Sequence, residues 1–243
     1  MNKNKVRIGS WITLNCPSIA EIMAESDFDW LCIDLEHSPI DYHETQLMIA
    51  AIQSKEKKAF VRVGENNSLL IKRVLDAGAD GIIVPNIISK ADADKAVNAV
   101  YYPPFGTRGV GLARAQKYGF GFDQYRDNDI KNIELILQIE NINALNELED
   151  IINTDGVDGT FIGPYDLSAS IGKPGDFDNK EVVLALNKYE KIAKKYKKLI
   201  GYHVVEPDSK IVKEKIKDGY NFIALSFDAF FLGRIIRNKL SEL

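Results

Sequence analysis

The sequence has few cysteines, no long apolar run and no excess of positive charge, and each absence excludes a class of protein. Cys16 and Cys32 are the two cysteines in 243 residues, too few for a disulfide framework and without metal-site spacing. No apolar stretch approaches the ~20 residues of a membrane span, and the first ten residues lack a signal peptide's apolar centre. The net charge of −4, with lysine and arginine dispersed, gives no basic face for nucleic acid. We therefore expect a soluble, cytoplasmic protein that binds neither membranes nor nucleic acid.

Strand-like and helix-like segments alternate along the whole chain. The strand-like segments are 6–14, 30–34, 59–63, 81–87, 133–140, 158–164, 199–205 and 222–227. They are continuous apolar runs without clean alternation, which is typical of strands covered on both faces. Eight such units favour an α/β fold, a (β/α)8 TIM barrel, with residues 1–243 as a single domain. A doubly wound open sheet is the alternative, but the first strand is not followed by a Gly-rich phosphate loop.

Capping residues mark several helix ends. Asp41 is a predicted N-cap, with Glu44 three residues later, and Ser89 with Asp92 has the spacing of a capping box. Gly78 suits the left-handed position that follows a helix. A last amphipathic helix is predicted over 228–240.

The segment 101–129 interrupts this rhythm. It is long, rich in glycine and aromatic residues, and follows the fourth predicted helix. Loops of this length are uncommon in compact domains and are often functional lids or interfaces. A surface loop without a functional role is an equally good interpretation.

Polar and charged side chains gather at the carboxyl ends of four predicted strands, which is where TIM barrels carry their chemistry. They are Asp34, Glu36 and His37 after the second strand, Arg62 in the third, Gln138 and Glu140 in the fifth, and Asp166 after the sixth. Each has a structural explanation by itself, such as a satisfied core cation or a helix cap. Their occurrence at neighbouring strand ends favours a functional site.

The residue types at these ends suggest enolate chemistry. Glu140 and Asp166, without nearby cysteine or clustered histidine, suit a hard cation such as Mg²⁺ or Mn²⁺. Arg62 could face a charge-developing oxygen, and His37 could be a general base oriented by Asp34. A metal, an arginine and a base around a small carboxylate would allow a proton to leave the carbon next to a carbonyl.

Two features of the chain bear on the substrate and on a competing mechanism. The turn at 163–166 (Gly163, Pro164, Tyr165 and Asp166) opens a short helical stretch whose backbone N–H groups could receive a substrate carboxylate. A Schiff-base aldolase would need a lysine inside the barrel, but the cores of the third to sixth predicted strands contain none.

Several of these motifs together resemble those of the HpcH/HpaI family of metal-dependent pyruvate aldolases. They are "GSWITLNCPSIAEIMAESDFDWLCIDLEHSP", "VRV", "GADGIIVPNI", "YPPFGTRGVG", "LQIEN" and "GVDGTFIGPYDLSASIG". The resemblance covers about residues 8–175 and continues weakly beyond. It implies a (β/α)8 barrel that reversibly cleaves 4-hydroxy-2-oxo acids to pyruvate and an aldehyde, through a metal-bound enolate.

The resemblance also implies roles for individual residues. Glu140 and Asp166 would be the ligands of a divalent metal (Mg²⁺ or Mn²⁺, with Co²⁺ a further candidate). Arg62 would hold the enolate oxygen, and His37 would be the acid/base group with Asp34 as its partner. The pyruvate site would be lined by Gln138 and by the backbone of Gly163, Pro164, Tyr165 and Asp166. The family tends to form homo-hexamers that exchange the last helix, here 228–240.

The chain departs from the family at a few positions. Leu35 stands where glycine is common in the family, and Tyr165 stands where alanine is common. The side chains around the aldehyde-binding pocket therefore differ from those usual in the family. His203 replaces an apolar residue; it is expected to be a satisfied barrel residue, with contact to the acceptor as the alternative. His43 is expected at the surface. Glu36 fits a structural ion pair and a supporting role at the site equally well.

Two other functions remain open on the sequence. One is a lyase of the same superfamily that acts on an acyl-CoA or an oxaloacetate-like acid, although no basic cluster marks a CoA site. The other is a non-catalytic barrel that binds metal and pyruvate. Because His37, Arg62, Glu140 and Asp166 are all present, we favour the aldolase.

Overall fold

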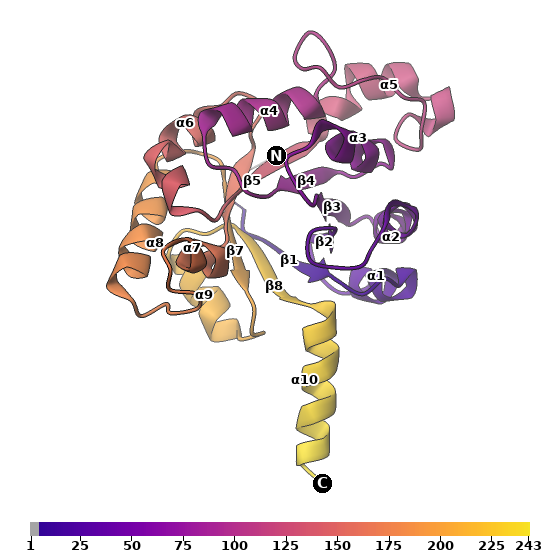
Figure 1. The fold of residues 1–243 in the computed structure, drawn as a ribbon. Coiled ribbons are helices and arrows are strands. Elements are labelled where there is room, and N and C mark those ends of the chain that lie inside the picture. Colours follow the sequence, from indigo (N-terminus) through magenta and orange to yellow (C-terminus); the bar gives the residue numbers. More distant parts are fainter. Residues whose placement is uncertain (1–4) are drawn as a thin grey trace.

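The computed structural model describes residues 5–243 and shows a closed barrel of eight parallel strands surrounded by helices (Figure 1). The strands follow chain order around the barrel, and the last pairs with the first. The strands are β1 (Arg7–Ile12), β2 (Trp30–Asp34), β3 (Lys58–Arg62), β4 (Gly81–Val84), β5 (Glu134–Ile139), β6 (Gly159–Ile162), β7 (Leu199–Val204) and β8 (Phe222–Phe227). The predicted (β/α)8 barrel is confirmed.

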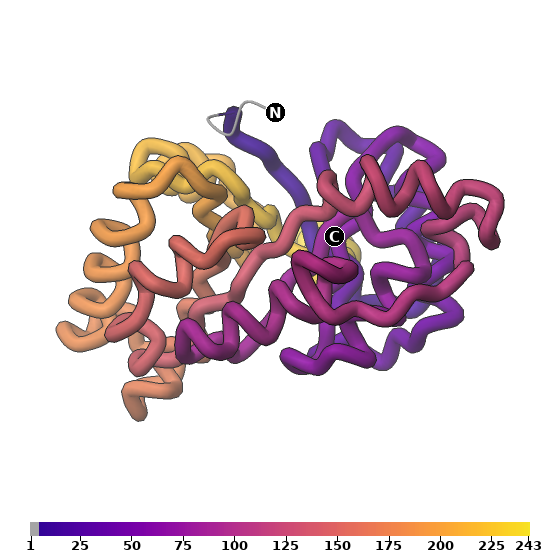
Figure 2. The backbone as a smooth tube through the Cα atoms, turned by 90° about the horizontal axis from the view of Figure 1, so that it is seen from above, coloured from indigo at the N-terminus to yellow at the C-terminus, as the bar shows by residue number. Residues whose placement is uncertain are grey.

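Helices cover the outside of the barrel, with the first half of the chain on one side and the second half on the other (Figure 2). The α-helices are α1 (Pro17–Ala24), α2 (Tyr42–Ser54), α3 (Ser68–Asp76), α4 (Lys90–Val100), α5 (Phe122–Asp127), α6 (Leu148–Asn153), α7 (Pro164–Ser170), α8 (Lys180–Ala193), α9 (Ser209–Lys217) and α10 (Asp228–Ser241). Short 3-10 segments are η1 (Lys117–Gly119), η2 (Asp129–Asn132) and η3 (Ile142–Asn146). Of the helices described in residues 5–243, none is both long and apolar enough to cross a membrane.

The predicted helix caps are present. The Asp41 side chain accepts hydrogen bonds from the backbone N–H groups of His43 and Glu44, and Ser89 forms the capping box with Asp92. These caps could be predicted from the sequence because a cap depends only on residues a few positions apart.

Several strands end earlier than predicted, and the backbone gives the reason. The predicted strand 81–87 stops at Val84 because Pro85 has no N–H to donate and Asn86 has a left-handed φ of 56°. The predicted strand 158–164 stops at Ile162 because Pro164 begins α7. At the end of β1, the N–H of Thr13 donates to the Asp228 carboxylate instead of to a neighbouring strand.

The interior of the barrel is filled mainly by aromatic rings. Trp30 and Phe222 stack with centroids 4.1 Å apart and planes 6° apart. The large rings fit because glycine lies opposite them. A Cβ on Gly81 would lie 2.3 Å from the Phe60 ring, and one on Gly201 would lie 2.3 Å from the Phe161 ring. The barrel is therefore a packed core, and ligands have room only at its ends.

The amino end of the barrel is closed by an ion cluster, here called the base cluster (Arg7, Lys58 and Glu134). Arg7 donates two hydrogen bonds to the Glu134 carboxylate, with Nη1 3.1 Å from Oε1, and Lys58 donates to the same carboxylate. Burial alone would raise the pKa of Glu134, but Arg7 and Lys58 outweigh it and hold that pKa below its ordinary value. Each charge in the cluster thus has an opposite partner.

The segment 101–129 packs outside the barrel, near the amino ends of β4 and β5. Arg108, with no exposed side-chain area, pairs with Asp76 at the end of α3 at 2.5 Å, and Arg114 donates to the carbonyl oxygen of Ala77. The segment does not contribute to the cavity at the opposite end of the barrel. It is therefore not a lid over this chain's own cavity.

The last helix, α10, projects away from the barrel (Figure 1). Its first residue, Asp228, is buried and accepts hydrogen bonds from the backbone of Thr13 and Leu14, which fixes the start of the helix. Further along, four apolar side chains are 49–64% exposed: Leu232, Ile235, Ile236 and Leu240. The projecting helix has an apolar surface that this chain does not cover.

Candidate active site

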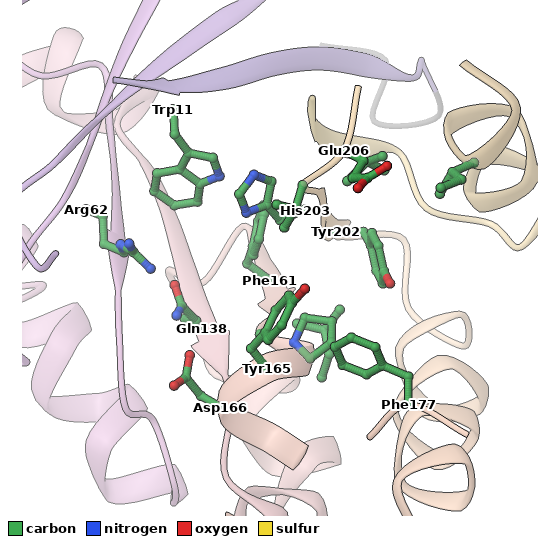
Figure 3. A pocket seen from close by; sticks show the side chains of 16 residues that line it. Trp11, Arg62, Gln138, Phe161, Tyr165, Asp166, Phe177, Tyr202, His203 and Glu206 are labelled. Carbon is green, nitrogen blue, oxygen red and sulfur yellow. The ribbon is translucent and has the colours of Figure 1, made fainter. Parts of the chain in front are cut away.

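A cavity of about 230 Å³ opens at the carboxyl ends of the strands (Figure 3). The predicted residues Arg62, Gln138 and Asp166 line it, together with the turn from Gly163 to Tyr165. Because neighbouring parallel strands end at the same face, residues more than one hundred positions apart share this cavity.

Arg62 is the central cation of the site. Its Nε lies 2.8 Å from Asp34 Oδ1 and its Nη2 lies 2.6 Å from Asp34 Oδ2, a bidentate pair. Its third nitrogen, Nη1, lies 3.2 Å from Glu36 Oε2. Burial alone would lower the pKa of Arg62, but the two carboxylates outweigh it and raise that pKa, so the guanidinium remains charged.

Asp34 contacts Arg62 and not the His37 ring. Its Oδ1 also accepts from the backbone N–H groups of Glu36 and His37, at 3.0 and 3.4 Å, which shapes the turn after β2. The predicted orientation of the His37 imidazole by the Asp34 carboxylate is not seen. The His37 ring is 63% exposed, and its Nε2 lies 3.7 Å from Glu36 Oε2.

Glu36 links Arg62 with His37 at the rim of the site. Its Oε2 faces Arg62 on one side and His37 on the other. Burial raises the pKa of Glu36 to about 7, against the opposing charge of Arg62, with the carboxylates of Glu140, Asp34 and Asp166 adding to the rise. Of the two interpretations open on the sequence, the ion pair is present, and the supporting role at the site stays a prediction.

Gln138 and Glu140 point to the same side of β5, as their spacing predicts. The Gln138 Nε2 donates to Glu140 Oε2, and the N–H of Asn86 lies 2.7 Å from Glu140 Oε1. Glu140 is 5% exposed, and burial raises its pKa despite these hydrogen bonds. The buried Oε1 of Gln138 has no hydrogen-bond partner among the described residues.

The turn at 163–166 carries Asp166 into the first turn of α7. A side chain at Gly163 would crowd Glu140, because a Cβ there would lie 3.1 Å from Glu140 Oε2. Tyr165 is 54% exposed and packs edge-on against Phe177, with centroids 4.9 Å apart. The glycine thus keeps open the space beside Glu140, and Tyr165 forms the outer wall.

The charges of the site fit a divalent cation. Four carboxylates (Asp34, Glu36, Glu140 and Asp166) are close enough to influence one another, and the cation among them is Arg62. Within residues 5–243 no three His, Cys, Asp or Glu side chains form a ready ligand cluster. A cation here would take Glu140 and Asp166 and complete its shell with water and substrate oxygens, which is the usual pattern for Mg²⁺.

Trp11 and His203 are among the residues that line the cavity besides the predicted site residues. The Trp11 ring packs 4.5 Å from the guanidinium carbon of Arg62 and 5.8 Å from the His203 ring, so it lies between them (Figure 3). His203 donates toward the carbonyl oxygen of Ser226 at 3.2 Å. Trp11 lies in the middle of the first predicted strand, 6–14, so its place at the cavity could not be predicted. Its neighbours come from β3 and β7 and are fixed only by barrel closure.

Comparisons with known proteins show the family of the chain. Residues 7–233 match the HpcH/HpaI aldolase/citrate lyase family, and the chain belongs to this family. A hydroxypyruvate/pyruvate aldolase of Sagittula stellata is 38% identical over 92% of this chain and 87% of its own length. A 2-keto-3-deoxy-L-rhamnonate aldolase of Escherichia coli is 33% identical over 99% of this chain and 90% of its own.

A solved structure shares the fold over almost the whole chain. It is that of an HpcH/HpaI aldolase/citrate lyase family protein from Burkholderia cenocepacia, with a TM-score of 0.93 and 32% identity, covering 98% of this chain and 95% of the other. The resemblance seen in the sequence motifs is therefore confirmed, and the chain is related throughout to carbon–carbon lyases.

Proposed function

We propose that the protein is a divalent-metal-dependent aldolase that reversibly joins pyruvate and an aldehyde into a 4-hydroxy-2-oxo acid. The observation that carries the proposal is the shared cavity of Arg62, Gln138 and Asp166, beside the buried Glu140 carboxylate. Two relatives at 33–38% identity are named as aldolases of 2-oxo acids, which supports the same reaction.

In this proposal Arg62 binds the C2 oxygen of pyruvate. Its guanidinium is held rigidly by Asp34 and Trp11, so it needs no reorganisation as negative charge grows on that oxygen. When bound by Glu140 and Asp166, a divalent cation supplies Lewis-acid stabilisation of the same charge. Gly163 supports the pair, because a Cβ at this position would lie 3.1 Å from Glu140 Oε2 and would crowd the carboxylate.

The pyruvate carboxylate would be bound by the turn that opens α7. The backbone N–H groups of Tyr165 and Asp166 lie in the first turn, where helix N–H groups have no helical partner. Gln138 lines the same cavity. Together these groups would orient the pyruvate methyl group toward the acceptor.

His37 would move the proton at the reacting carbons. Its ring is 63% exposed, so it can exchange protons with solvent, and Glu36 lies 3.7 Å from its Nε2. We therefore propose Glu36 in the partner role that the sequence suggested for Asp34. Asp34 would instead position Arg62.

We also propose that the chain is a single domain that assembles into a homo-oligomer, with a hexamer favoured. The barrel uses strands from Arg7 to Phe227, which supports one domain. The uncovered apolar surface of α10 supports the exchange of this helix between subunits. Light scattering of the full chain and of a chain shortened before Asp228 would test this assembly. The cytoplasmic location expected from the sequence stays a prediction.

The test of the proposed reaction is hydrogen exchange at the methyl group of pyruvate in D₂O, followed by NMR. It needs no aldehyde. Deuteration that requires Mg²⁺ or Mn²⁺ and stops with EDTA is the expected result. If pyruvate keeps its methyl protons with every divalent metal, the enolate proposal fails and the acyl-CoA lyase or the non-catalytic barrel takes its place.

A further inference from the structure

The backbone that follows β4 directs two consecutive N–H groups toward β5 and the residue after it. The N–H of Asn86 donates to Glu140 Oε1 at 2.7 Å, and the next N–H, that of Ile87, donates to the carbonyl oxygen of Gln138 at 3.3 Å. In a regular strand, successive N–H groups point to opposite neighbours. Two consecutive donors that face the same neighbour therefore mark a change in the backbone conformation.

The change is the left-handed conformation of Asn86, which has a φ of 56°. A left-handed residue can turn two consecutive N–H groups toward one side, as in the backbone nests that bind anions. Asparagine adopts this region more readily than most residues, whereas a β-branched residue there is a genuine outlier. Asn86 is exposed, so burial of its side chain does not explain the conformation. Strained backbone of this kind is typical of functional sites.

The two oxygens of the buried Glu140 carboxylate thus have separate donors. Oε1 accepts from the Asn86 N–H, and Oε2 accepts from Nε2 of Gln138. One donor on each oxygen fixes the plane of the carboxylate, whereas a single donor leaves it free to rotate. The Asn86 donor is the stiffer of the two, because it belongs to the backbone and Gln138 contributes a side chain with three rotatable bonds.

We infer that Asn86 is a positioning residue, whose left-handed backbone orients the Glu140 carboxylate for a divalent cation. A carboxylate that is already fixed loses less freedom when it binds a metal, and hydrogen-bond partners of metal ligands typically contribute about 10–100-fold to metal affinity. In this role Asn86 acts through Glu140 and does not itself contact the metal. The inference rests on the proposed role of Glu140 as a metal ligand.

The test measures Mn²⁺ binding to the full chain without substrate, by electron paramagnetic resonance of the free ion. Asn86→Val, whose β-branched side chain disfavours a positive φ, should weaken Mn²⁺ affinity about tenfold. Asn86→Gly adopts this φ freely and keeps the N–H, so its affinity should stay within about twofold of wild type. Asn86→Ala should lie between them, at about threefold, and decides the question if Asn86→Val does not fold.

Glu56 provides the matched control, since it is also an exposed residue with a φ of 56° but follows α2, away from Glu140. Glu56→Val makes the same unfavourable change in the backbone and should keep the Mn²⁺ affinity of wild type. Thermal unfolding in EDTA measures the loss of stability in each variant. Wild-type affinity in Asn86→Val, or in Asn86→Ala if the valine variant is unfolded, would overturn the inference. An equal loss of affinity in Asn86→Gly or in Glu56→Val would overturn it as well.

Glu140→Gln separates this inference from the proposal on which it rests. If Glu140→Gln loses Mn²⁺ affinity and Asn86→Val keeps it, the positioning role of Asn86 alone fails. If the wild type binds no Mn²⁺, or if Glu140→Gln binds it as the wild type does, Glu140 is not a metal ligand and both fail.

Discussion

The two ends of the barrel differ in how their buried carboxylates are balanced by cations. At the amino end, the base cluster gives one carboxylate, Glu134, two cations, and the pKa of Glu134 is held below its ordinary value. At the carboxyl end, four carboxylates share Arg62, and the pKa values of Glu36 and Glu140 are raised. A cluster in which each charge has an opposite partner stabilises a fold. Buried charges without such partners are instead typical of sites where a ligand supplies the opposite charge.

The largest effect is expected from removing the cation at the carboxyl end. Arg62→Ala should lower kcat/KM for the aldol reaction about 1,000-fold, the upper range for loss of one preorganised charge donor. Arg7→Ala, at the amino end, is the matched control and should change kcat/KM less than threefold per folded molecule. Steady-state kinetics of both variants checks this. Similar losses in both variants would mean that the two ends do not differ in function.

Metal binding should depend on Glu140 and not on Glu134. Glu140→Gln removes a proposed ligand charge and should weaken Mg²⁺ or Mn²⁺ binding about 100-fold or more. Glu134→Gln makes the same chemical change at the other end and should leave the metal affinity unaltered. Isothermal titration calorimetry with each metal measures both. Unchanged affinity in Glu140→Gln would remove Glu140 from the ligand set.

Acid should destabilise the carboxyl end through His203. The folded-state pKa of His203 is about 4, against about 6.5 unfolded, so between these values the unfolded chain binds the extra proton. Stability is therefore present above pH 6.5 and is lost as pH falls, by about 2 kcal/mol between pH 7 and pH 5. Denaturation of wild type and His203→Gln in EDTA at both pH values checks this. Equal losses in the two proteins would contradict a depressed pKa.

The smallest effect is expected from disrupting the base cluster. Glu134→Gln leaves Arg7 and Lys58 without their carboxylate, but these side chains are 16% and 24% exposed, so water partly replaces it. The free energy of unfolding should fall by about 1–2 kcal/mol, less than for a fully buried pair. Catalytic activity per folded molecule should not change. Urea denaturation and active-site titration measure the two quantities, and a loss of activity at constant stability would assign the amino end a functional role.

Local signals in the sequence predicted most of the fold. The eight apolar runs, the Asp41 cap and the capping box of Ser89 depend on residues close in the chain, and all are present. The strand ends were predicted less well, since a proline or a left-handed residue such as Asn86 ends a strand inside an apolar run.

Part of the site could be predicted in the same way, because strand ends of a barrel meet by topology. Arg62, Gln138 and Asp166 were named from sequence and line one cavity. The partner of Asp34 was not predictable, since Arg62 and the His37 ring were both within reach of the turn after β2 and three-dimensional packing selected Arg62. The contact of Trp11 with His203 could not be predicted from the sequence either, because it joins the first and seventh strands.

The sequence by itself determined the order of strands and helices, the family and the set of polar residues at the strand ends, since these depend on periodicity and on motifs along the chain. Only the tertiary structure decided which carboxylate pairs with which cation, and where the unpartnered groups lie. The physical reason is that a side chain's pKa and its free hydrogen-bonding atoms are set by burial and by neighbours distant in sequence. Barrel closure brings those neighbours together, and it places Ser226 where its carbonyl oxygen fixes His203.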